Sequence, residues 1–201
     1  NVCYSQTCMG QPKGKSANKR LLELNPHIHI ETYETSCLKE NALGLLKGYE
    51  LLIDGTDNFP TRYLVNYACV LAGVPYFYGS IFRFEGQVSV FNALLEGGGR
   101  GPNYRDLYPI PPAPGQVPNC AEGGVLGVLP GIIGAMQANE ALKLICGFGQ
   151  LLSGRMLLFD AADFSTRILR FAPNPTTKIE QLIDYELFCG MPATESIPSL
   201  D

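Results

Sequence analysis

The sequence lacks any long run of positive charge. No stretch of lysine and arginine is longer than Lys19 and Arg20, and the formal net charge of the 201 residues is -4. Nucleic acids and anionic membrane surfaces are bound by clustered basic side chains. The charge pattern therefore argues against a nucleic-acid partner and a membrane partner, and it favours a basic partner surface or none.

A membrane-spanning segment is missing as well. The most apolar stretch, residues 125–146, loses its unbroken apolar character at Gln137, whereas a bilayer requires about 20 apolar residues. We therefore expect a buried core helix that begins or kinks at Pro130. Small residues along it would let a neighbouring element approach closely, and these are Gly127, Gly131, Gly134 and Ala138.

Closely spaced cysteine pairs are also absent. The chain has no C-x-x-C motif, and no signal peptide opens it. Disulfide frameworks belong to oxidising compartments, so an odd number of cysteines without such pairs predicts a reducing, cytoplasmic location. Cys69 and Cys146 lie in helical apolar patterns and are expected to be small core residues. The seven cysteines are Cys3, Cys8, Cys37, Cys69, Cys120, Cys146 and Cys189.

The remaining composition predicts one sizeable core. With 46% hydrophobic and 17% charged residues, a chain of this length can bury a single domain, which we place at residues 1–172. Past Pro173 the sequence becomes polar, so residues 173–201 are predicted to be a tail or linker. Because the chain begins with Asn1 rather than Met and its first predicted helix follows almost at once, we expect an N-terminal portion of the domain to be missing.

Residues 51–66, LLIDGTDNFPTRYLVN, are the most informative stretch. A short apolar run closed by Asp54 is typical of a central parallel strand covered on both faces, and the following turn leads into an amphipathic helix. Asp57 then lies at a strand end beside a helix N-terminus, where a carboxylate can hold a metal-bound phosphate. The alternative is that Asp57 and Asn58 only cap the helix.

Strand-like and helix-like patterns alternate along the chain, which predicts an α/β fold with a mostly parallel sheet. A strand predicted at residues 27–33 places His27 and His29 on one face. They could form a metal pair, but no further ligand lies nearby, so an exposed strand face is favoured. The other predicted elements are helices at 11–25 and 40–47, strands at 74–81 and 87–92 that pair antiparallel, and a strand hairpin at 154–161 and 165–171.

A long irregular segment separates these elements. Residues 93–119 show no periodicity and are rich in glycine and proline. Loops of this length in compact domains are usually functional or disordered, so we expect a crossover over the active site. Cys120 follows directly, near a helix start that would favour its thiolate. From the residues alone an ordinary loop thiol is the favoured interpretation, because no histidine lies near it.

Six segments then follow one another in an order that matches a known family. They are GQPKGKSA (10–17), LNPHI (24–28), DGTDNFPTRYLVN (54–66), RFEGQVSVF (83–91), NCAEGGVLGVLPGIIGAMQANEALK (119–143) and the final strand pair. Together they resemble the adenylyltransferases that activate ubiquitin-like sulfur-carrier proteins, which include molybdopterin-synthase and thiamine-biosynthesis adenylyltransferases and ubiquitin-activating enzymes. The match covers residues 10–172 and is more specific than any single motif.

The resemblance also narrows the fold and the subgroup. The proline-rich loop and LIDYELFCG (182–190) look most like the sulfurtransferase-linked subgroup, in which the latter segment leads toward a C-terminal rhodanese domain. The implied fold is a Rossmann-like, doubly wound, mostly parallel sheet with an antiparallel extension, here lacking its first βαβ segment. Members of the family are commonly homodimers, and we carry this over as an expectation.

The chemistry implied by the resemblance is ATP-dependent adenylylation of the C-terminal glycine of a ubiquitin-like carrier protein that ends in Gly-Gly. Lys13 would contact phosphate, Asp57 would bind Mg²⁺, and Asn58 would lie beside the nucleotide. Arg62 would either steer the carrier tail or only solvate the helix face. Cys120 matches the cysteine that captures the activated carrier as a thioester or takes part in sulfur transfer. Molybdopterin synthesis, thiamine synthesis and tRNA thiolation all remain open as pathways.

Three departures from the family pattern are apparent. The family usually holds a structural zinc with two C-x-x-C pairs, but Asn103 and Asp106 replace the first pair and PNPTTK (173–178) replaces the second. Zinc is therefore expected to be absent. The family's N-terminal glycine loop has no counterpart in this chain. The arginine of the family's N-x-x-R-Q motif has no counterpart either, because Ser5 stands where it would be expected.

These departures leave more than one functional hypothesis. The first is an adenylyltransferase, inactive if this fragment acts alone. The second is a degenerate, non-catalytic relative that only docks the carrier or a partner subunit. A nicotinamide-dependent dehydrogenase would share only the sheet architecture, which does not fix function.

Overall fold

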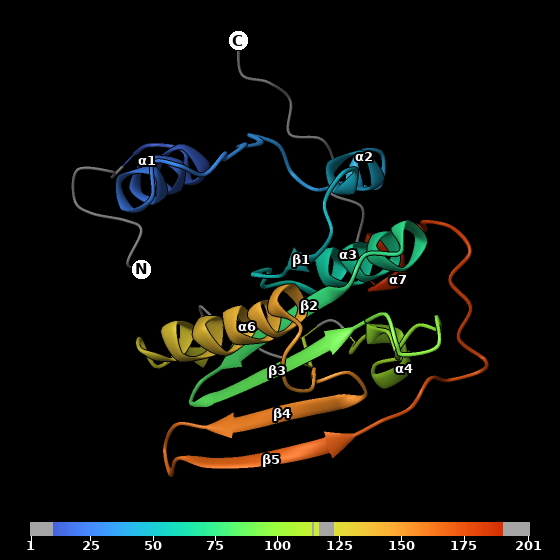
Figure 1. Ribbon diagram of the computed structural model, residues 1–201. Helices are drawn as coiled ribbons and strands as arrows, with labels where there is room; N and C mark the ends of the chain where they lie inside the picture. The colour runs from blue at the N-terminus through green and yellow to red at the C-terminus, as the bar shows by residue number, and fades with distance from the viewer. Residues whose placement is uncertain (1–9, 114, 117–122, 191–201) are drawn as a thin grey trace. The chain divides into compact units, whose positions relative to one another are not determined.

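The computed structural model describes residues 10–113, 115–116 and 123–190 (Figure 1). Two compact units share the chain, Asn1–Cys37 and Leu38–Asp201, and each has its own internal contacts. Among the helices in the described ranges, none is both long and apolar enough to cross a bilayer.

Within residues 10–37, the first unit contains one helix, α1 (Lys13–Leu24), which confirms the helix predicted at 11–25. It ends where the Asn25 backbone N–H donates to the Leu21 carbonyl at 2.9 Å. The segment after the helix contacts it through polar groups. The Asn18 side-chain amide donates to the Ile30 carbonyl at 3.2 Å, and Lys15 forms an exposed ion pair with Glu34 at 2.8 Å.

The strand predicted at 27–33 is wrong, because no residue there is in a strand. Alternating polarity yields a strand only when a neighbouring strand supplies the backbone ladder, and no strand pairs with this segment in the described part of the chain. Its presumed core face is also open, since Ile28 is 42% exposed. His29 Nε2 lies 3.2 Å from Glu31 Oε1.

The second unit is built on a five-stranded sheet of order β1-β2-β3-β4-β5. β1 is parallel to β2, and the other three pairs are antiparallel. The elements are α2 (Ala42–Leu46), β1 (Leu52–Ile53), α3 (Phe59–Ala72), β2 (Tyr76–Phe82), β3 (Glu85–Phe91), α4 (Tyr104–Leu107), α6 (Leu129–Cys146), β4 (Arg155–Asp160), β5 (Ser165–Arg170) and α7 (Tyr185–Phe188).

The α/β class and both predicted hairpins are confirmed, but the sheet is mixed, and "mostly parallel" is wrong for the described strands. Short loops explain this result: Arg83 and Phe84 alone join β2 to β3, and so short a loop can connect only antiparallel strands. β1 is also not the central strand that was predicted. It pairs only with β2 in the described part of the chain, and Ile53 is 50% exposed.

One face of the sheet is covered by α6, as Figure 1 shows. Phe77, Val90 and Ala141 share one apolar cluster, and Val88 and Ile133 share another. The predicted core helix is thus confirmed as a helix, with proline in its first turn.

Strand glycines, and not the helix glycines, permit the close approach of α6. A Cβ atom at Gly79 would lie 2.3 Å from the Gln137 side chain, and one at Gly86 would lie 2.2 Å from Ile133. A Cβ atom at Gly131 or Gly134 would meet no atom within 4 Å among the described residues. The prediction that these helix glycines admit a packed neighbour is therefore not met within this part of the chain.

The other face of the sheet is aromatic. Tyr78 and Phe91 from the strands contact Tyr104 of α4, and Tyr76 contacts the ring of Tyr78. The Tyr104 ring lies 5.1 Å from that of Tyr63 in α3. The segment 93–119, predicted to lack regular structure, therefore contains a helix that is anchored by a buried tyrosine.

Helix α7 packs against α3 beyond the predicted domain boundary at residue 172, through ring contacts of Phe188 with Tyr63 and of Tyr185 with Tyr67. That boundary stays a prediction.

Of the two cysteines expected in the core, Cys69 is buried as predicted, and Cys146 is exposed because it lies on the outer side of α6 at its last turn.

The tyrosine-rich face predicts a loss of stability at alkaline pH. Burial raises the pKa of Tyr108 to about 12, and burial followed by the Asp54 charge raises that of Tyr76 well above its usual range. An unfolded tyrosine ionises near pH 10. Above that pH the folded protein therefore binds more protons than the unfolded protein does. The stabilisation is fully present below about pH 10, and the free energy of unfolding falls as the pH rises further. The fall is up to about 1.4 kcal/mol per pH unit for each such residue.

Melting temperatures measured across this pH range provide the test. Tyr108→Phe should make the alkaline decline shallower, whereas Tyr49→Phe, at a side chain that is 45% exposed, should leave it unchanged. A melting temperature that stays constant well above pH 10 would contradict the prediction.

Candidate functional site

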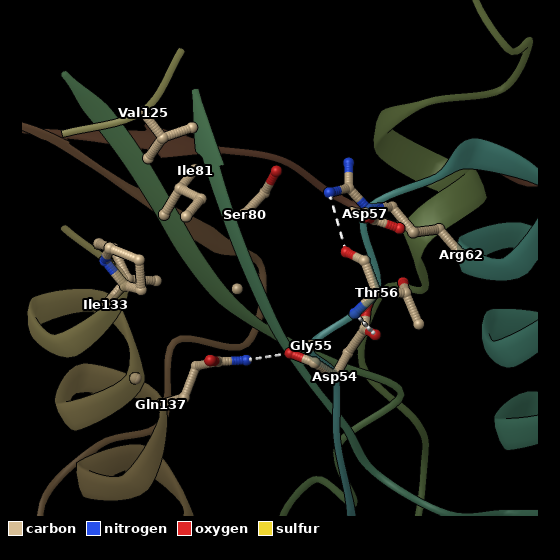
Figure 2. A pocket seen from close by; sticks show the side chains of 13 residues that line it. Asp54, Gly55, Thr56, Asp57, Arg62, Ser80, Ile81, Val125, Ile133 and Gln137 are labelled. Atoms are coloured by element: carbon tan, nitrogen blue, oxygen red, sulfur yellow. Dashed lines mark hydrogen bonds between the residues drawn. The ribbon is translucent and has the colours of Figure 1, made fainter. Parts of the chain in front are cut away.

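A pocket of about 340 Å³ opens at the carboxyl end of β1. Three elements line it: the turn between β1 and α3, the second half of β2, and the first turns of α6, as Figure 2 shows. This is the edge of an α/β sheet at which ligands commonly bind. The polar side chains around it are Asp54, Thr56, Asp57, Arg62, Ser80 and Gln137.

A buried carboxylate holds the turn in place. Asp54 is only 3% exposed; its Oδ2 accepts a 2.6 Å hydrogen bond from the Tyr76 hydroxyl, and its Oδ1 accepts a 2.7 Å bond from the Thr56 backbone N–H. The second bond is an aspartate turn of the kind that the Asp-Gly-Thr sequence favours. Sequence reasoning used Asp54 only to end the strand and missed this role, although that signal was available.

Gln137 of α6 fixes the same turn from the other side. Its side-chain amide donates to the Asp54 carbonyl at 2.8 Å and to the Phe77 carbonyl at 3.1 Å. Both carbonyls belong to strand ends, so one buried side chain links α6 to β1 and β2. The sequence analysis noted Gln137 only as the end of an apolar run. A glutamine inside such a run was the available signal, because a buried polar group requires a partner.

Asp57 and Asn58 were predicted either to bind a ligand or only to cap the helix, and the structure gives them different positions. Asn58 Oδ1 accepts a 2.9 Å hydrogen bond from the Thr61 N–H, so Asn58 is the N-cap of α3. Asp57 does not cap the helix; it is exposed and lines the pocket. Asp57 Oδ1 accepts only a long, 3.5 Å bond from the Asn58 side-chain amide, whereas both Asp54 oxygens take short bonds. Asp57 therefore supplies the exposed, open carboxylate of the pocket, and a carboxylate is the type of donor that Mg²⁺ prefers.

Arg62 faces the same pocket, so the alternative that it only solvates the helix surface is wrong. One guanidinium N–H donates to the Thr56 carbonyl at 3.2 Å, and the group lies 5.7 Å from the centre of the Tyr78 ring. Burial lowers its pKa, but Tyr78 and other nearby oxygens outweigh that effect and raise the pKa overall, so the charge is retained. Its Nε is buried and has no hydrogen-bond partner among the described residues.

Two other predicted site residues lie in other parts of the chain. Lys13 is an exposed residue at the start of α1, in the first unit. Cys120 lies outside the described residues, as does Ser5. The predicted roles of Lys13, Asp57, Asn58, Arg62 and Cys120 toward nucleotide, metal and carrier therefore stay predictions.

The positions at which the family pattern implies zinc carry a hydrogen-bond network. Asp106 Oδ2 accepts from the Asn103 backbone N–H at 2.7 Å and from its side-chain amide at 2.8 Å, and Asp106 Oδ1 accepts from the Asn174 N–H at 3.0 Å. Asn66 of α3 joins through a 3.2 Å bond to Asn103. These oxygens are already bonded, and an Asn and Asp pair without thiolates does not fit a structural zinc.

No metal cluster is apparent elsewhere in the described ranges, where no group of three or more His, Cys, Asp or Glu side chains is placed to hold a metal ion. A magnesium ion that arrives with a nucleotide does not require such a cluster, because it takes one or two carboxylates together with phosphate oxygens.

The fold is that of an α/β domain with a pocket at a strand end, and the chain belongs to the ThiF family, whose family model matches residues 1–180. A probable adenylyltransferase/sulfurtransferase MoeZ of Mycobacterium tuberculosis is 50% identical over 196 residues, which is 97% of this chain and 50% of that protein. A sulfur carrier protein adenylyltransferase of Thermus thermophilus is 47% identical over 197 residues, which is 94% of this chain and 73% of that protein.

More distant relatives agree with this assignment. An adenylyltransferase and sulfurtransferase MOCS3 of Drosophila yakuba is 44% identical over 202 residues, which is 96% of this chain and 44% of that protein. A structure of E. coli MccB with ATP superposes with a TM-score of 0.71 at 15% identity, over 89% of this chain and 53% of that one, which shows a shared fold. The chain spans about half the length of the MoeZ relative.

The network around Asp106 predicts a metal-independent fold in this region. Replacing Asp106 with alanine removes the N3 half of the capping box of α4 and leaves the Asn174 N–H without its acceptor, which should cost about 1–3 kcal/mol in the free energy of unfolding. Denaturant unfolding measures that loss. Treatment of the unaltered protein with a chelator should leave its midpoint unchanged, and stoichiometric zinc found by metal analysis would contradict the prediction.

Proposed function

We propose that this chain is the adenylating part of a sulfur-carrier protein adenylyltransferase, which uses ATP to activate the C-terminal glycine carboxylate of a ubiquitin-like carrier. The observation that carries the proposal is the placement of an open carboxylate, Asp57, and a retained cation, Arg62, on one strand-end pocket. The MoeZ, Thermus and Drosophila relatives are named as adenylyltransferases, which supports the same activity.

The proposed reaction requires the site to offset the negative charge of its two reactants, and it requires no proton transfer. A carboxylate oxygen of the carrier forms a bond to the α-phosphorus of ATP, and the bond from that phosphorus to the oxygen bridging to the β-phosphate breaks. Pyrophosphate leaves with the electron pair, and the carrier becomes an acyl adenylate. Because the attacking carboxylate is already ionised at neutral pH, no general base is needed. The site must align two anions and offset their charge.

The pocket residues supply those two requirements. Arg62 presents a positive charge that its bond to the Thr56 carbonyl and its contact with Tyr78 hold toward the pocket. Asp57 would hold Mg²⁺, which offsets the charge of the phosphates when bound. The Thr56 hydroxyl is buried with no partner among the described residues, so it is a further group that can bond a ligand. Lys13 is proposed as a phosphate contact and Asn58 as a neighbour of the nucleotide.

The later steps are proposed from the family membership. Cys120 would capture the activated carrier as a thioester or take part in sulfur transfer, in keeping with the sulfurtransferase part of the relatives' names. The carrier is proposed to end in Gly-Gly, and the enzyme to act as a homodimer. The mostly parallel, doubly wound sheet of the family would require strands beyond those described.

A non-catalytic docking protein is the second candidate, and the loss of the zinc cysteines favours it. The network of Asn103, Asp106 and Asn174 weakens that argument, because it joins the two segments that the metal would otherwise link. An inactive relative also has no need of an open carboxylate beside a retained cation.

Replacing Asp57 with asparagine in the complete protein that carries this chain should lower carrier-dependent exchange between pyrophosphate and ATP by about a hundredfold or more, because several kcal/mol of charge stabilisation is lost. The matched control is Glu96→Gln, which removes an exposed charge away from the pocket and should retain activity. Full exchange activity in the Asp57 variant would refute the proposal. Exchange that is absent from the unaltered protein would favour the docking role.

A further inference from the structure

The pocket is divided into a polar side and an apolar side. Figure 2 shows Asp57 and Arg62 on one side, and Ile81, Val125 and Ile133 across from them. On the apolar side, the Gln137 side-chain NH2 is already engaged, because it donates to two backbone carbonyls. A narrow ligand segment without bulky side chains and with an anionic end fits such a division.

Gly134 lies on the apolar side, on the pocket face of α6. It follows Pro130 by four residues and precedes Gln137 by three, and all three line the pocket. A Cβ atom at Gly134 would meet no atom within 4 Å among the described residues, so it would extend into open space. Gly79 differs, since a Cβ atom there would collide with Gln137.

Among the described residues, neither the backbone conformation nor a packed neighbour explains glycine at this position. Gly134 is inside a regular helix and is not among the glycines with positive φ. A glycine within a helix destabilises it relative to alanine, so the residue opposes folding stability. What its missing side chain does provide is space in the pocket.

We propose that Gly134 is a specificity-determining residue that keeps the apolar side of the pocket wide enough for an extended acyl tail without side chains, whose carboxylate reaches the polar side. This inference rests on the proposed function and names the group that sets its tail selectivity. Gly55, which also lines the pocket and whose Cβ position has no atom within 4 Å among the described residues, gives the tail additional space.

The test compares Gly134→Ala with Gly131→Ala in the complete protein. Gly131 is on the same helix, also has open space around its Cβ position, and does not line the pocket. Both changes should raise the melting temperature by about 1–3 °C, because alanine favours a helix. Only Gly134→Ala should lower kcat/KM for a Gly-Gly-ended carrier from the same genome, by about tenfold or more, as expected when one methyl group blocks a fitted site.

Two further measurements identify the ligand that the methyl group excludes. The Kd of ATP, measured by calorimetry without carrier, should be the same for Gly134→Ala and the unaltered protein. The opposite result, weakened ATP binding with an unchanged KM for the carrier, would overturn the proposal and assign the apolar side to the nucleotide.

Equal losses of activity in both glycine variants would also overturn the proposal, because they would reflect helix stiffening. So would a Gly134→Ala protein with a higher melting temperature and full activity. If the unaltered protein shows no exchange between pyrophosphate and ATP, the proposed function itself fails. That result is distinct from a difference between the two glycine variants, which tests only the role of Gly134.

Discussion

The site depends on one buried carboxylate. Asp54 is removed from water at the end of β1, and such burial is costly unless the oxygens are bonded. The Tyr76 hydroxyl and the Thr56 N–H satisfy both oxygens, so the bonds that remove the cost also fix the shape of the turn. Burial raises the pKa of Tyr76 well above its usual range, which keeps its proton in place. Asp57 is open to a ligand because Asp54 carries the structural role.

The second constraint is the close contact of α6 with the strands. Gln137 bonds to the carbonyls of Asp54 and Phe77, and it occupies the space that any side chain at position 79 would need. The pocket therefore has one wall on a helix and another on a sheet, joined by a buried polar group. Sites supported on such rigid elements hold their geometry better than sites on loops.

In the polar network around Asp106, hydrogen bonds stand at the positions where the family pattern implies a structural zinc. Asn66, Asn103, Asp106 and Asn174 connect α3, the cap of α4 and the segment after β5 through bonds of 3.2 Å or less. A structural metal joins distant segments by ligand bonds; here a carboxylate and amides do so by hydrogen bonds. Each bond is individually modest, but the network leaves few buried groups unsatisfied.

Local patterns were enough to predict the α/β class, both hairpins, the helices at 13–24, 59–72 and 129–146, and the position of Asp57 at a strand end, because these depend on periodicity, caps and short loops. The folded structure was needed to show that residues 27–33 form no strand, that β1 is short and half open, and that Asn58 caps the helix while Asp57 lines the pocket. Strand pairing and burial depend on partners distant in the chain, and a side chain's role depends on which of its atoms are already bonded. Neither strand pairing nor the bonding of individual side-chain atoms can be predicted from the local sequence alone.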